Sequence, residues 1–149
     1  MQLSWLGRAH TEGDTAVWLP VDRILFAGDL VEASASPYWG DAYIQDWIGT
    51  LKNVRALGAQ IVVPGRGAVV RDAAMEQAID ETQEYLTILR NTVRAAVLRE
   101  ASIAKTYHDA ESTLTRRFGT WAIFKHCLPF NVLFPHHSTW LYPGRPQPL

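Results

Sequence analysis

Three polar loops interrupt the first 70 residues, and each follows a short apolar segment with the character of a strand. The apolar segments are expected as strands at residues 3–6, 15–19, 23–27 and 60–63. The second and third are separated by a short turn, which is typical of an antiparallel hairpin. The polar loops lie at residues 8–14, 27–31 and 63–67. Because α/β proteins bind their ligands at strand ends, any site is expected in these loops.

Helical periodicity follows the hairpin and dominates the second half of the chain. Apolar residues recur at three- and four-residue spacing over residues 41–57, 72–97 and about 102–118. Gly58 supplies the stop of the first helix, and Asp72 is expected as the N-cap of the second. This order predicts an α/β layered fold with a short mixed or antiparallel sheet and C-terminal helices.

Composition limits the classes of protein to which the chain can belong. Its 149 residues fit one globular domain, and its net charge of −1 gives no footprint for nucleic acid or an anionic membrane. No apolar run reaches the roughly 18 residues of a membrane span, and no signal peptide is visible. The single cysteine, Cys127, excludes an internal disulfide framework. We therefore expect a cytoplasmic protein that binds neither nucleic acid nor a membrane.

His10 and Asp29 are the candidate metal ligands in the strand-end loops. An imidazole and a carboxylate suit zinc or another divalent metal, but two ligands are too few for an all-protein site. A lone loop histidine is more often structural, and a Gly-Asp pair is more often a turn. Three aromatic residues lie near the Asp29 loop: Tyr38, Trp39 and Trp47. They either line a substrate groove or fill the core, and we favour the core.

The motifs between Gly7 and Val70 resemble the second half of a metallo-β-lactamase-fold hydrolase. The family's His-Thr-x-Gly-Asp loop is matched by residues 10–14, and its Leu-Phe-x-Gly-Asp segment by residues 25–29. Its Val-Pro-Gly-His-Gly motif is matched by residues 63–67 except at Arg66. The resemblance implies one half of a four-layer αββα sandwich, with zinc bound in the full-length family.

The resemblance also implies roles for single residues. His10 matches a metal-binding histidine, and Asp29 matches the carboxylate that bridges the ions in two-metal members, where the metals activate a water. Asp14 is expected to orient the His10 loop. Arg66 stands where the last metal-binding histidine occurs, and a guanidinium has no acceptor with which to bind a cation. It either pairs with Asp29 in place of a second metal or points outward as a surface arginine.

The chain lacks the family's main ligand motif, His-x-His-x-Asp-His. We therefore expect a fragment. Residues 1–132 are expected as the C-terminal part of a metallo-β-lactamase-like domain, with the sheet in residues 1–70 and helices in residues 71–132. Residues 133–149 are expected as a Pro-rich tail. Zinc binding by this chain is expected to be weak or absent. The function is that of a metal-dependent hydrolase, incomplete and inactive as this chain alone. The alternative is a non-catalytic module that keeps the scaffold and acts by binding or by self-association. In the second case two copies would form a homo-oligomer through an exposed sheet face.

Overall fold

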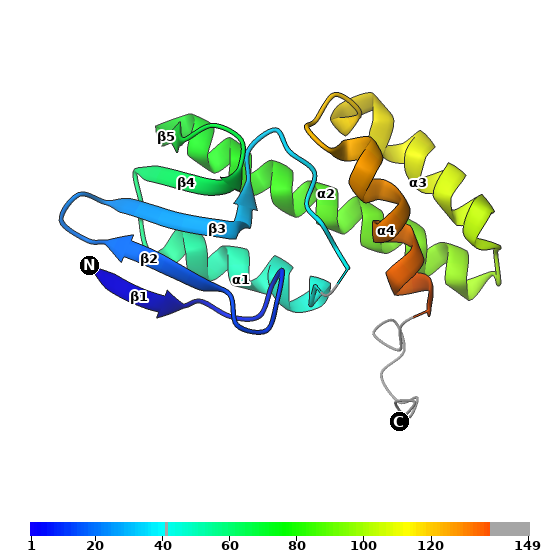
Figure 1. Cartoon of the computed structure of the whole chain (residues 1–149), viewed down its shortest axis with the longest axis horizontal. Coiled ribbons are helices and arrows are strands. Elements are labelled where there is room, and N and C mark those ends of the chain that lie inside the picture. Colours follow the sequence, from blue (N-terminus) through cyan, green and yellow to red (C-terminus); the bar gives the residue numbers. More distant parts are fainter. Residues whose placement is uncertain (41, 138–149) are drawn as a thin grey trace.

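The computed structural model describes residues 1–40 and 42–137, which form a mixed sheet with helices on one face and a helical part beside it (Figure 1). The sheet has five strands in the order β1-β2-β3-β4-β5. The strands are β1 (Gln2–Trp5), β2 (Thr15–Leu19), β3 (Ile24–Glu32), β4 (Ile61–Arg66) and β5 (Val70–Arg71). Only β3 and β4 pair in parallel, while the other neighbours are antiparallel. The predicted hairpin and the mixed α/β sheet are confirmed.

Strand β3 is longer than the sequence predicted. The Gly28-Asp29 pair was expected to end the strand, but β3 continues to Glu32. Gly28 adopts a φ of 53°, a left-handed conformation that glycine tolerates, and the register with β4 shifts on both sides of it. The irregularity bends the strand without ending it, so residues expected in a loop lie in the sheet.

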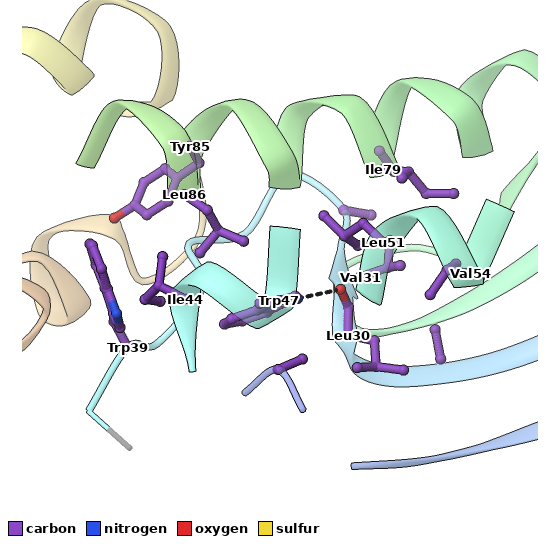
Figure 2. Close-up of a cluster of buried hydrophobic side chains, with 14 of the residues drawn as sticks. Leu30, Val31, Trp39, Ile44, Trp47, Leu51, Val54, Ile79, Tyr85 and Leu86 are labelled. Atoms are coloured by element: carbon purple, nitrogen blue, oxygen red, sulfur yellow. Dashed lines mark hydrogen bonds between the residues drawn. The ribbon is translucent and has the colours of Figure 1, made fainter. Parts of the chain in front are cut away.

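The core fills the space between the sheet and two helices, α1 (Ile44–Ala56) and α2 (Asp72–Leu98) (Figure 2). Trp47 of α1 lies at its centre and is fully buried, and its indole N–H donates a hydrogen bond to the Leu30 carbonyl at 2.9 Å. Trp39 is 4% exposed. The core interpretation of Trp39 and Trp47 is confirmed, whereas Tyr38 is only half-buried.

Three helices form the C-terminal part. The long α2 extends beyond the sheet, where it packs against α3 (Ile103–Phe118) and α4 (Phe124–His137) (Figure 1). Ser102 caps α3 by accepting a hydrogen bond from the Lys105 N–H at 3.2 Å. The expected cap of α2 was wrong: the cap is Arg71, in extended backbone, and Asp72 is the first helical residue. No helix of the described chain could cross a membrane.

Helix α4 crosses the boundary that the sequence placed at residue 133. The helix continues through Pro129 and includes residues 133–137, while the rest of the expected Pro-rich tail, residues 138–149, lies outside the described residues. Within α4, Cys127 is 1% exposed and His126 is exposed, so the two adjacent side chains diverge. They do not form a metal-binding pair.

The sheet face opposite α1 and α2 is apolar and lies open. Strand pairing aligns one apolar row across four strands, Leu3, Val17, Phe26 and Val63, and a second row, Leu19, Ile24 and Ile61. Leu3 is 71% exposed and Phe26 is 43% exposed. On the other face of the same strands Leu25 and Val62 are fully buried. The described residues thus cover one side of the sheet only.

Candidate functional site

The first strand-end loop, which carries His10, is held from two sides. From α1, the Thr50 hydroxyl donates to the Arg8 carbonyl at 2.8 Å, and the Asn53 amide donates to the Leu6 carbonyl at 2.7 Å. Within the loop, the Asp14 carboxylate accepts hydrogen bonds from the backbone N–H of Thr11 at 2.9 Å and from its hydroxyl at 2.8 Å. Asp14 therefore closes the turn that presents His10, the geometry that a loop-orienting role requires.

The structure brings His10 and Asp29 together from separate loops. His10 Nδ1 lies 3.7 Å from Asp29 Oδ2, and the imidazole packs edge-on against Trp47 with ring centroids 5.9 Å apart. His10 Nε2 is buried and has no hydrogen-bond partner among the described residues. Two residues that are 19 positions apart in the sequence thus share one strand-end site.

Arg66, at the end of β4, points into the same site. Its Nη1 lies 3.2 Å from Asp29 Oδ1 and also donates to Glu32 Oε1. The close approach of the two strands depends on Gly65, because a Cβ at that position would lie 2.1 Å from Asp29 Oδ1. Of the two orientations expected for Arg66, the structure has the one in which its side chain pairs with Asp29, and not the one in which it points outward to solvent.

Glu32 is a member of this site that the sequence did not identify. Its side chain is fully buried, and Oε2 has no partner among the described residues. The pKa of Glu32 is raised from 4.5 to about 8, chiefly because the carboxyl is buried; the Arg66 guanidinium opposes the rise, and the neighbouring Asp29 adds to it. Glu32 lies one residue beyond the polar loop expected at residues 27–31. The sequence feature that could have identified Glu32 is the apolar pair Leu30-Val31 directly before it, because this pair continues the strand as far as Glu32.

A buried polar network fixes the loop that follows Glu32. The Asn131 amide donates to the Pro37 carbonyl at 2.8 Å, and its oxygen accepts from the Trp39 N–H at 2.7 Å. The Ser36 hydroxyl donates to the Tyr85 hydroxyl at 2.8 Å. Residues from α2 and α4 therefore hold the rim beside the site. No pattern in the sequence pointed to Asn131, because its partners are 92 and 94 positions away.

The donor set does not fit a catalytic zinc ion. Among the described residues, no group of three His, Cys, Asp or Glu side chains could hold a metal. His10 and Asp29 are suitable donors, but a catalytic zinc takes about three protein ligands and a water. One oxygen of Asp29, Oδ1, already faces the charged Arg66 guanidinium at 3.2 Å, while Oδ2 faces His10. A metal would have to compete with that cation and find further ligands.

The model of the metallo-beta-lactamase superfamily matches residues 6–66, which span the three loops and the strands that carry them. The match supports the metallo-beta-lactamase fold superfamily over this part of the chain. The metallo-beta-lactamase type 2 of Bacillus cereus is 41% identical over 68 residues, which are 42% of this chain and 27% of the relative. The enzyme of the same name from Bacteroides fragilis is 36% identical over 91 residues, 58% of this chain and 35% of the relative.

The solved structures agree on the fold. The metallo-beta-lactamase IND-7 superposes with a TM-score of 0.50 at 24% sequence identity, over 57% of this chain and 39% of that one. At that identity the likeness concerns the fold alone. The chain spans 27% and 35% of the two curated relatives named above. The match contains His10, Asp14, Asp29 and Arg66 and ends before α2, so the C-terminal helices lie outside it.

Proposed function

We propose that this chain derives from the metal-dependent hydrolases of the superfamily and that it hydrolyses no substrate by itself. The observation that carries the proposal is the site at the ends of β3 and β4. There His10 and Asp29 lie 3.7 Å apart inside the matched region, without a third metal-binding side chain beside them in the described structure. In the full-length family these positions bind metal, by the resemblance of their motifs. Here they are two donors of a set that needs about three.

A small-molecule substrate such as a β-lactam is proposed from the names of the relatives. The fold does not fix the chemistry, so thioesters, lactones and phosphodiesters belong in the same test. The purified chain, supplied with zinc, is assayed with a chromogenic β-lactam and with one substrate of each other class. His10→Ala is the matched control for background hydrolysis. We expect equal rates for both proteins. Hydrolysis that is lost with a chelator and lost in His10→Ala contradicts the proposal.

The open sheet face favours a second candidate function, self-association with another copy of this chain. The face carries two apolar rows, and two of its polar side chains are already bonded within the chain. The Trp5 indole N–H donates to the Glu12 carbonyl at 3.1 Å, and the Thr15 hydroxyl donates to the Gly13 carbonyl at 3.1 Å. A partner surface that excludes water would therefore leave neither of these two donors without a hydrogen-bond partner. The same face of a second copy is uncharged apart from Arg71 at the β5 edge, so two faces can pack around a two-fold axis.

Sedimentation velocity over a range of concentrations tests self-association. We expect a concentration-dependent dimer that Leu3→Lys and Phe26→Lys each weaken at least tenfold. Leu98→Lys, on an apolar residue that is 65% exposed at the end of α2, is the control and should leave the dimer intact. Circular dichroism verifies that each variant is folded. A monodisperse monomer at every concentration, or equal weakening by the control, contradicts this candidate.

A further inference from the structure

We propose that the Arg66 guanidinium is the resident cation of this site: it joins Asp29 and Glu32 permanently, so that the cluster holds together without a metal ion. The inference goes beyond the proposed function, because it concerns what occupies the site and not whether the chain turns over a substrate. It rests on the geometry of three side chains from two paired strands.

The backbone places the three side chains together. Strands β3 and β4 run parallel, with Glu32 opposite Arg66, and the Ala33 N–H donates to the Arg66 carbonyl at 3.0 Å. Asp29 lies three positions before Glu32 on the same strand, beyond the irregularity at Gly28. Two acidic side chains from one strand thus converge on a single basic side chain from its neighbour.

One nitrogen of the guanidinium serves both carboxylates. Arg66 Nη1 lies 3.2 Å from Asp29 Oδ1 and donates to Glu32 Oε1. The Glu32 side chain is fully buried, while those of Asp29 and Arg66 are each 32% exposed. Water can therefore solvate part of the Asp29–Arg66 pair, but it cannot replace Arg66 as the partner of Glu32. Removing one member of a buried pair is costly, because the other member stays buried without its partner.

A guanidinium differs from a metal ion in a way that an experiment can detect. It has no acceptor, remains charged at any ordinary pH and is covalently part of the chain. A chelator therefore cannot extract it, and added zinc meets a site whose positive charge is already in place. Metal-dependent folding, by contrast, makes the stability of a protein sensitive to chelators.

The test is a double-substitution cycle read by thermal unfolding of the full chain, with and without EDTA. Arg66→Met should lower the melting temperature by about 5 °C, since it leaves the buried Glu32 carboxyl without its hydrogen-bond partner. Adding Glu32→Gln to Arg66→Met should recover at least a third of that loss. Arg71→Met, an exposed arginine on the neighbouring strand, is the control and should shift the melting temperature by no more than about 2 °C. EDTA should leave the wild-type melting temperature unchanged.

Three results overturn the proposal: a loss for Arg66→Met no larger than for Arg71→Met, strictly additive effects in the double variant, or a wild-type melting temperature that falls with EDTA. If Arg66→Met does not fold, Arg66→Lys decides the question. A lysine keeps the charge, so a folded Arg66→Lys protein supports the resident cation, and an unfolded one contradicts it. None of these readouts depends on hydrolysis, so the proposed function can fail while this inference stands.

Discussion

The two faces of the sheet are made from alternate residues of the same strands, yet they meet different surroundings. Leu25 is fully buried under α1 and α2, and its neighbour Phe26 is 43% exposed on the open face. Helices from this chain pack on one side only (Figure 1). The apolar pattern on the two faces therefore exceeds what the described helices cover. One face stabilises the fold, and the other is available for association.

The largest expected effect comes from truncating neighbouring residues on opposite faces. Leu25→Ala should lower the free energy of unfolding by about 2–5 kcal/mol, because it leaves a cavity in the core. Phe26→Ala should cost about 1 kcal/mol, mainly through lost cross-strand contacts. Urea titrations at a concentration where the chain is monomeric measure both. If Leu25→Ala and Phe26→Ala lowered the free energy of unfolding equally, the open face would have to be covered by another part of the chain.

A second prediction concerns the buried carboxyl at the end of β3. The pKa of Glu32 is about 8 in the folded chain, against 4.5 as the ordinary value. The folded state thus holds a proton that the unfolded state releases, so Glu32 stabilises the fold fully below pH 4.5. Its contribution declines as the pH rises towards 8, by up to about 1.4 kcal/mol per pH unit.

Glu32→Gln removes this titration and keeps the shape of the side chain. Urea titrations of both proteins at pH 5, 6.5 and 8 should therefore give a smaller decline with pH for the variant. The difference between the two proteins isolates Glu32 from other titrating groups. Parallel pH dependences would contradict the burial of this carboxyl.

The smallest expected effect lies in the exposed His10 loop. Asp14→Ala removes both hydrogen bonds to Thr11 and should cost about 1 kcal/mol of unfolding free energy. Glu12→Ala, in the same loop, should cost less than about 0.5 kcal/mol, because its side chain is exposed. Chemical denaturation measures both, and a larger cost for Glu12→Ala would show that Asp14 does not hold the loop.

Local patterns predicted the elements well because they depend on nearby residues. The hairpin, the helix after Ser102 and the apolar stripe of α2 each follow from short-range spacing and capping. The motifs around His10, Asp29 and Arg66 also named three residues that the structure brings together at the strand ends, while their role as a site stays a prediction. The sequence could not choose between the two orientations of Arg66, because that choice depends on the parallel pairing of β3 with β4.

The errors have a common physical cause in tertiary context. Gly28 and Asp29 have the composition of a turn, but pairing with β4 carries the strand through them to Glu32. The expected Pro-rich tail began at residue 133 and included Pro135, whereas α4 continues to His137. Asn131 bonds to a loop more than 90 positions away, a contact that local patterns do not contain.

The described site lacks a set of ligands for a catalytic zinc, and we propose that Arg66 is its resident cation. Elemental analysis of the purified chain, after incubation with zinc and exhaustive dialysis, tests this most directly. We expect far less than one zinc ion per chain, because two donors leave most of the coordination shell to water. One or two zinc ions per chain that survive dialysis, and that are lost in His10→Ala, would contradict it.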